Sequence, residues 1–106
     1  GDIVSDLCAG LVGGLGVVPG ANIGTDVAVF EAVHGSAPDI AGQGVANPLG
    51  LIKSSVLMLE HLGELSAAER LDEAIHTAMR SGDAITGDLG GNAKTDDVAN
   101  AIIKAL

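Results

Sequence analysis

Hydrophobic residues follow two different spacings along this chain, and the spacing changes between its first half and its second. In the first half, short apolar runs stand between glycines, so residues 13–24 predict a short strand between turns and Val27–Val33 predicts the clearest strand. Ahead of them, apolar residues at helical spacing predict a helix that begins near Ser5. The second half carries three apolar stripes with a helical period. The pattern therefore predicts an α/β fold with few strands and three C-terminal helices.

Each of the three predicted C-terminal helices has a recognisable start. Asn47 followed by Pro48 is typical of an N-cap with proline at the first helical position. Ser66 and Glu69 have the spacing of a capping box, and Thr95 is expected to cap the last helix. The first two stripes each end at a glycine, as helices commonly do. The apolar residues expected to face the core are, helix by helix, Ile52, Val56, Leu59 and Leu62; Leu71, Ile75 and Met79; and Val98, Ile102 and Leu106.

The composition narrows the classes of protein and partner that fit this chain. A length of 106 residues allows one domain, and with one Phe and no Trp or Tyr its core must be aliphatic. The formal charge of −9, from 14 acidic and 5 basic residues, argues against nucleic acid and anionic membranes as partners. No apolar run approaches the roughly 20 residues that span a bilayer, and no signal peptide is recognisable. We expect a cytoplasmic protein in which the single Cys8 is a small buried hydrophobe.

Residues 34–47, which follow the clearest strand, combine Gly and Pro with isolated polar side chains and predict a ligand-binding loop. Asp39 matters most, because an acid in a nucleotide loop accepts hydrogen bonds from both ribose hydroxyls and repels a 2′-phosphate. It would therefore select NAD over NADP. His34 is either a structural residue or a group that stacks on or hydrogen-bonds a planar ligand. Asn47 is either a helix cap alone or a cap that also binds adenine.

Two acids near the start of the chain could hold a cation. Asp2 and Asp6 are four residues apart, so on one helix their Cβ atoms would lie about 5–6 Å apart. Such carboxylates repel each other unless a cation such as Mg²⁺ or Mn²⁺ lies between them; alternatively, they only stabilise the helix N-terminus. The glycines that follow are not a phosphate cradle, because Gly14 and Gly16 lack a third glycine at the fingerprint spacing. Thr86–Asn92 predicts a flexible loop.

Several ordered motifs of the chain resemble the isocitrate/isopropylmalate dehydrogenase family. They are residues 1–6 (GDIVSD), 10–16 (GLVGGLG), 30–42 (FEAVHGSAPDIAG), 46–48 (ANP) and 86–91 (TGDLGG). The resemblance covers nearly the whole chain, but only about the C-terminal third of a family subunit. It implies that residues 1–106 form a single partial domain, the C-terminal part of a dehydrogenase subunit.

The resemblance implies roles for the residues at matching positions. Asp2 and Asp6 match two of the family's three divalent-metal carboxylates, and the third comes from the other subunit of the dimer. Glu31 would lie near the cofactor. The adenosine-binding loop would comprise His34, Gly35, Ala37, Asp39, Ile40 and Asn47. The family's catalytic Tyr and Lys and its substrate-binding arginines and serine lie upstream, so no catalytic residue is assigned and no turnover is expected from the chain alone.

Cofactor and substrate follow from the same resemblance. Asp39 matches the ribose-binding acid of NAD-using members, where NADP-using bacterial isocitrate dehydrogenases carry Lys-Tyr in place of Asp39 and Ile40. Residues 18–24 (VPGANIG) are more similar to isocitrate and homoisocitrate dehydrogenases than to isopropylmalate dehydrogenases, and Glu31-Ala32 favours isocitrate. These features imply NAD-dependent decarboxylation of isocitrate to 2-oxoglutarate and CO₂, a step of the tricarboxylic acid cycle.

Other readings of the chain stay open at this point. It could be a segment of a homoisocitrate or 3-isopropylmalate dehydrogenase, because these enzymes share the cofactor loop. It could also be a non-catalytic nucleotide-binding or assembly fragment. A partial α/β domain exposes strand edges and faces that the rest of the fold would cover, so we expect a homo-oligomer.

Overall fold

The computed structural model of the protein describes residues 2–106, with side chains from residue 3 onward. The helices and strands are, in order, α1 (Asp2–Leu11), β1 (Pro19–Ile23), β2 (Ala28–Ala32), α2 (Leu49–His61), α3 (Leu65–Ser81) and α4 (Thr95–Ala105). Short 3₁₀ helices are η1 (Leu15–Val17), η2 (Pro38–Ile40) and η3 (Gly87–Leu89). The α/β class with few strands and a helical C-terminal half is confirmed.

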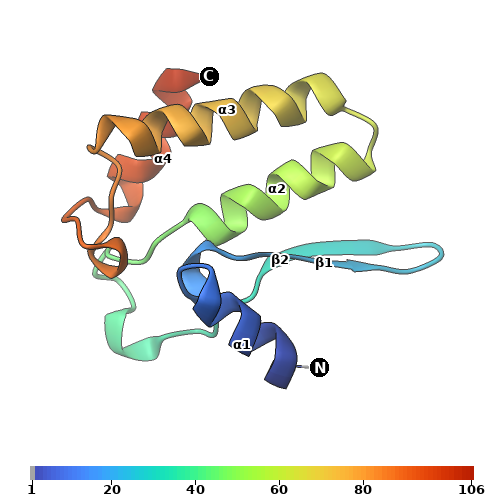
Figure 1. The fold of residues 1–106 in the computed structure, drawn as a ribbon, viewed down its shortest axis with the longest axis horizontal. Helices are drawn as coiled ribbons and strands as arrows, with labels where there is room; N and C mark the ends of the chain where they lie inside the picture. Colours follow the sequence, from blue (N-terminus) through green and yellow to red (C-terminus); the bar gives the residue numbers. More distant parts are fainter. Residues whose placement is uncertain (1) are drawn as a thin grey trace.

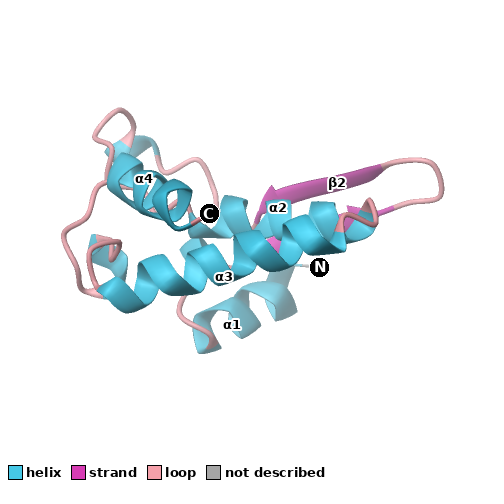
Figure 2. Cartoon of the chain, turned by 90° about the horizontal axis from the view of Figure 1, so that it is seen from above, coloured by secondary structure: helices cyan, strands magenta, loops and turns pink. Residues whose placement is uncertain are grey.

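Helix α2 lies at the centre of the molecule. One side of it faces the β1–β2 hairpin and the other faces α3, and α4 packs on α3 in turn (Figure 1). Seen from above, the hairpin extends beyond the helices at one end, while α1 lies apart from α4 (Figure 2). The contacts of α1 are chiefly with η1. The helices and the hairpin therefore meet along α2, and α1 is the least packed of the described helices.

The two predicted strands form an antiparallel hairpin. Its register pairs Pro19 with Ala32 at one end and Ile23 with Ala28 at the other. The turn between them is closed by the Gly24 amide, which donates to the Val27 carbonyl over 2.9 Å. The strand predicted within residues 13–24 is present as β1, preceded by η1, and the strand predicted at Val27–Val33 is β2.

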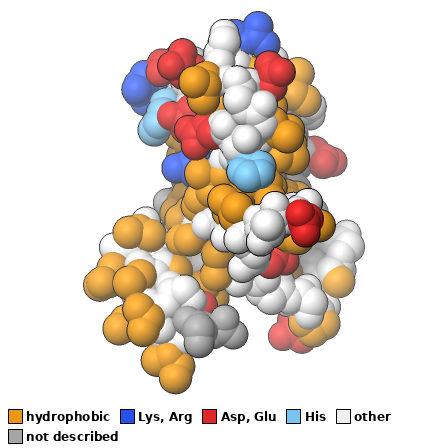
Figure 3. Space-filling view, turned by 90° about the vertical axis from the view of Figure 1, so that its right-hand side faces the viewer, with side chains coloured by type: hydrophobic (Ala, Val, Ile, Leu, Met, Phe, Trp, Pro, Cys, Tyr) orange, Lys and Arg blue, Asp and Glu red, His pale blue; other side chains and the backbone are white. Residues whose placement is uncertain are grey.

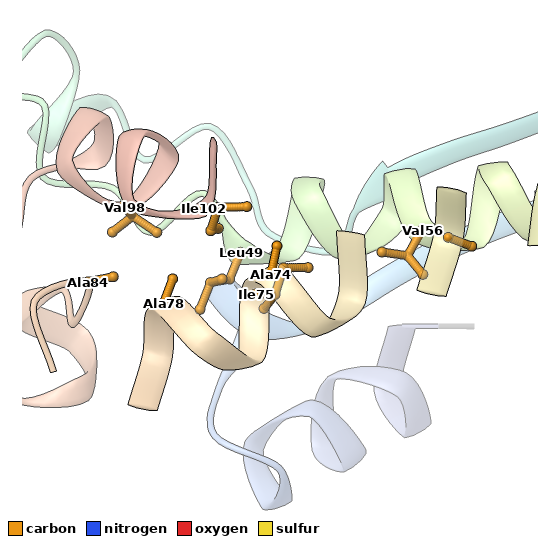
Figure 4. Packing of buried hydrophobic residues seen from close by; sticks show 9 residues of the cluster. Leu49, Val56, Ala74, Ile75, Ala78, Ala84, Val98 and Ile102 are labelled. Carbon is orange, nitrogen blue, oxygen red and sulfur yellow. The ribbon is translucent and has the colours of Figure 1, made fainter. Parts of the chain in front are cut away.

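The core is aliphatic, as the composition requires, and it is made mainly by the three C-terminal helices. Figure 4 shows Val98 and Ile102 of α4 above Ala78 and Ile75 of α3, with Leu49 of α2 beside them. These side chains are at most 4% exposed. The predicted core positions on α2, α3 and α4 are thus largely confirmed. Two are wrong: Leu62 and Leu106 are exposed, because each lies just beyond the last residue of its helix.

Close packing of the hairpin against α2 depends on two small residues of that helix. A Cβ atom on Gly50 would lie 3.0 Å from the Gly16 carbonyl oxygen and 3.3 Å from the Cβ atom of Ala32 in β2, so glycine fits here without displacing these neighbours. One turn later the Ser54 hydroxyl is 1% exposed and accepts a hydrogen bond from the Gly20 amide over 3.2 Å. It also lies 2.8 Å from the carbonyl oxygens of Glu31 in β2 and Gly50 in its own helix, which share its single donor hydrogen. A single side chain therefore ties both strands of the hairpin to the helix.

Several predictions about helix ends are wrong. Helix α1 already includes Asp2, ahead of the expected start near Ser5. Helix α3 begins at Leu65, so Ser66 lies inside it and no side chain caps its start. Thr95 does not cap α4. The N-cap position is Lys94, whose amide donates a hydrogen bond to the Asp97 carboxylate over 2.8 Å. Each of these helices therefore begins one or more residues earlier than the sequence predicted.

Cys8 is exposed, which overturns the expectation that it is a buried hydrophobe. The cause is the sparse packing of α1, whose Ile3 and Leu11 are 87% and 80% exposed. Figure 3 shows hydrophobic side chains gathered at the lower left, over α1, whereas charged side chains gather on the upper part of the molecule. None of the helices in the described part of the chain combines the length and apolar character required to cross a membrane.

Ser54→Ala tests the attachment of the hairpin to α2. The substitution removes the hydroxyl and leaves the Gly20 amide and Glu31 carbonyl without this partner, so we expect the free energy of unfolding to fall by about 1–3 kcal/mol. Urea unfolding followed by circular dichroism measures it. Ser55→Ala is the matched control, since the Ser55 hydroxyl contacts only the Leu51 carbonyl of its own helix. Equal effects of the two substitutions would contradict this role of Ser54.

Candidate functional site

A pocket of about 810 Å³ lies where the loop after β2 meets the segment between α3 and α4. Its lining residues come from the 34–47 loop, which we call the first wall, and from residues 87–94, the second wall, together with Gly16. The predicted loop residues that line it are His34, Gly35, Ala37, Ile40 and Asn47. The sequence-predicted ligand loop therefore surrounds a cavity, and its residues converge on that cavity from both ends of the loop.

The first part of the loop is shaped by local backbone constraints. The His34 ring nitrogen Nδ1 lies 2.9 Å from the Gly35 carbonyl oxygen, and because a carbonyl only accepts, Nδ1 carries the proton. In neutral His34 the other ring nitrogen, Nε2, is therefore free of a proton and can accept. Ala37 has φ of 42°, a left-handed conformation that is uncommon for a residue with a Cβ. It precedes η2 and turns the chain so that Ile40 reaches the pocket.

Asn47 closes the loop and joins three segments. Its Oδ1 accepts a hydrogen bond from the amide of Leu49, the first residue of α2, over 3.0 Å, although the N-cap position is occupied by Pro48, one residue later than the sequence predicted. Its Nδ2 donates to Oδ2 of Asp88 over 3.0 Å. The side chain is 9% exposed and lines the pocket. Asn47 thus bonds the start of α2 and also lines the pocket, and its predicted contact with adenine stays a prediction.

Asp88 connects the two walls. Its Oδ1 accepts a hydrogen bond from the Thr86 hydroxyl, which is 1% exposed, and its Oδ2 accepts from Asn47. Burial acts to raise the pKa of Asp88, but these hydrogen bonds, with those from the backbone amides of Asp88 and Leu89, together lower it below its ordinary value. The carboxylate is consequently charged at neutral pH and able to hold both donors.

Thr95 makes a second connection between the walls. Its hydroxyl donates to the Ala46 carbonyl over 2.6 Å, and its amide donates to the Gly44 carbonyl over 2.9 Å. The hydroxyl that was expected to cap α4 therefore holds the end of the 34–47 loop against the start of that helix.

Two residues of the predicted adenosine loop and its surroundings do not line the pocket. Asp39 is exposed in η2, and its carbonyl accepts a hydrogen bond from the Gln43 side chain over 2.9 Å. Glu31 is exposed on β2, where its carboxylate accepts from Asn22 over 3.1 Å. Asp39 directly precedes Ile40, which lines the pocket, whereas Glu31 belongs to strand β2 of the hairpin. Their roles stay predictions.

The metal prediction rests on α1. This helix includes both predicted positions, four residues apart, and the Asp6 side chain is exposed. The Asp2 side chain lies outside the described residues, so the arrangement of the two carboxylates stays a prediction. Among the side chains that the structure describes, no group of three His, Cys, Asp or Glu residues could hold a metal ion.

Residues 86–91 carry one of the motifs of the family resemblance, but the sequence assigned none of them to the site. Thr86–Asn92 was expected to be a flexible loop, yet it contains η3, and the Ala93 amide donates to the Ile85 carbonyl over 2.9 Å. Gly91 is required there, because a Cβ atom would collide with the Ile85 carbonyl. The available signal was the TGDLGG motif itself, which carries an acid between glycines.

The acid dependence of stability tests the environment of Asp88. Because its pKa is lower in the folded than in the unfolded state, its contribution is fully present above the unfolded pKa and is lost as pH falls through the folded pKa. We therefore expect wild-type unfolding free energy to fall relative to that of Asp88→Asn below about pH 4. Urea unfolding at pH 6, 4 and 3 measures this difference. Asp26→Asn, at an exposed acid of the hairpin turn, controls for net charge, and parallel curves for all three proteins would contradict the expectation.

Known proteins resemble this chain closely. It is 55% identical over 106 residues to the isocitrate/homoisocitrate dehydrogenase of Thermus thermophilus. That alignment covers 100% of this chain and 31% of the Thermus protein. It is 53% identical over 107 residues to the mitochondrial NAD isocitrate dehydrogenase subunit alpha of Homo sapiens, covering 100% of this chain and 29% of that subunit. The crystal structure of isocitrate dehydrogenase from Methylococcus capsulatus matches with a TM-score of 0.92 and 52% identity, over 98% of this chain and 31% of that one.

The chain thus spans about a third of the length of these relatives and corresponds to their C-terminal part. The family match extends over residues 1–102, which include the whole pocket. On this match, and on relatives more than half identical to it, the chain belongs to the isocitrate/isopropylmalate dehydrogenase family.

Proposed function

We propose that this chain is the C-terminal portion of an NAD-dependent isocitrate dehydrogenase, which converts isocitrate to 2-oxoglutarate and CO₂. The observation that carries the proposal is the pocket in which five of the predicted adenosine-loop residues meet. Its volume of about 810 Å³ is within the range of small-molecule sites, roughly 300–1,000 Å³. A human relative is named as an NAD isocitrate dehydrogenase subunit.

The residues of the pocket fit the adenosine half of NAD. Ile40 and Ala37 offer apolar surface for a purine, and Asn47 offers an amide that can bind its edge. Asp39, exposed beside the pocket, is proposed to accept from the ribose hydroxyls and to repel a 2′-phosphate. NAD, when bound, accepts a hydride from the substrate. The chain's own contribution is to bind and orient the cofactor by its adenosine end.

A divalent metal is proposed at α1. Asp2 and Asp6 would supply two carboxylates, and Mg²⁺ or Mn²⁺ there would polarise oxygens of the 2-hydroxy acid. Because two carboxylates are an incomplete set for such an ion, a third ligand from a second subunit fits the proposal. The exposed apolar side chains of α1 support association with another copy of the protein. The Thermus thermophilus relative is named for isocitrate and homoisocitrate alike, so homoisocitrate is the alternative substrate.

Calorimetric titration with NAD and NADP tests the cofactor assignment. We expect the chain to bind NAD in preference to NADP, and Asp39→Asn to reduce that preference by about tenfold or more, since charged hydrogen bonds contribute about 1.5–3 kcal/mol. Asp83→Asn, at an exposed acid outside the pocket lining, is the matched control. Equal affinity of the wild-type chain for the two nucleotides would overturn the proposed role of Asp39.

A chimaera tests the activity. This chain would replace the matching region of the Thermus thermophilus relative, and we expect the product to reduce NAD with isocitrate and Mn²⁺. Asp6→Asn in the same chimaera should lower kcat by at least about a hundredfold, because a bound metal contributes several kcal/mol of transition-state stabilisation. Asp26→Asn serves as the control for lost charge. A chimaera that binds NAD and melts like the parent enzyme, yet does not reduce NAD, would contradict the proposed activity.

A further inference from the structure

Asn47 has both ends of its side-chain amide engaged by the protein, and the two contacts agree on one orientation. The oxygen accepts from the Leu49 amide, and the nitrogen donates to the Asp88 carboxylate, each over 3.0 Å. A flipped amide would place its oxygen against the Asp88 carboxylate and its N–H against the Leu49 N–H. Both contacts would then be repulsive, so the order of donor and acceptor in the pocket is fixed.

The side-chain amide of Asn47 can form further hydrogen bonds beyond these two. A side-chain amide carries two N–H donors and two oxygen lone pairs, of which the two contacts use one each. What remains is one N–H donor and one oxygen lone pair, on a side chain that lines the pocket. That pair complements the edge of adenine, which presents a ring-nitrogen acceptor beside the 6-amino donor. It does not complement a 6-oxo purine in the same position, where a carbonyl oxygen would face the amide oxygen.

Asp88 is itself held in place independently of Asn47. Its other carboxylate oxygen accepts a hydrogen bond from the hydroxyl of Thr86, a buried residue. The backbone carbonyl of Thr86 in turn accepts hydrogen bonds from the amides of Leu89 and Gly91. The carboxylate therefore belongs to a structured turn rather than to a free side chain. It can impose an orientation on Asn47 from across the pocket.

We propose that Asp88 is a positioning residue, which fixes the Asn47 amide so that the site selects a 6-aminopurine over a 6-oxopurine. This inference rests on the proposed binding of NAD and adds to it the determinant of base selectivity. Thr86 supports Asp88 in that role and does not touch the base.

The test compares binding of NAD with binding of nicotinamide hypoxanthine dinucleotide, which differs only at the purine edge, by calorimetry on the full chain. We expect the wild-type chain to prefer NAD by about tenfold or more, and Asp88→Ala to reduce this ratio to near unity. Asp88→Asn keeps an acceptor oxygen and should retain most of the ratio. A merely structural role would weaken both ligands alike and leave the ratio unchanged. Asp83→Asn, at an exposed acid outside the pocket lining, is the control and should leave the base ratio as it is in the wild type.

Hydrogen exchange of the Asn47 side-chain amide by NMR gives a second measurement that needs no variant. We expect one of its two protons to exchange slowly, because it is bonded to Asp88, and the other to become protected only when NAD is added. An unchanged base ratio in Asp88→Ala, or two equally exchanging protons, would overturn the role of Asp88 while leaving NAD binding intact. Failure of the wild-type chain to bind either dinucleotide would overturn the proposed function, and this inference with it.

Discussion

The contact between α2 and the β1–β2 hairpin is the constraint on which the rest of the structure depends. Two strands alone are marginal in water, so the hairpin needs a surface to pack against, and α2 provides it. Gly50 allows the backbone of residue 16 to approach, and Ser54 bonds the amide of one strand and can donate to the carbonyl of the other. A larger residue at position 50 would push these neighbours apart, and loss of the Ser54 hydroxyl would remove its bonds to the hairpin.

This contact also positions the two ends of the binding loop. The loop begins where β2 ends and finishes where α2 starts, so packing of the strand on the helix determines the distance that residues 34–47 must span. The loop itself has little regular structure besides η2. Its shape at the far end comes from Thr95, which bonds two carbonyls of the loop, and from the contact of Asn47 with the start of α2. A loop of this kind can be ordered without being a helix or a strand because its polar backbone groups are satisfied by neighbouring elements.

Hydrogen bonds across the pocket couple stability to the site. Asn47 ends the loop, begins α2 and contacts Asp88, so the same amide contributes to folding and to the lining of the cavity. Apolar packing of α3 and α4 supports this arrangement from behind, because Val98 and Ile102 hold α4 on α3 and thereby place the start of α4 against the loop. In contrast, α1 takes little part in this network, and its apolar side chains are exposed.

Local sequence was sufficient for the elements, their order and the inward faces of the three C-terminal helices, because periodic burial and backbone preferences act over a few residues. The contact of Asn47 with the start of α2, the clearest strand and the position of the 34–47 loop belong to this group. Tertiary structure decided what depends on distant partners. Cys8 is exposed since few residues of the described chain pack on α1, and the Thr95 hydroxyl bonds the loop 49 residues away instead of capping its own helix. Asp88 joins the pocket only because the fold brings residues 86–88 against residue 47, a proximity that no spacing in the sequence encodes.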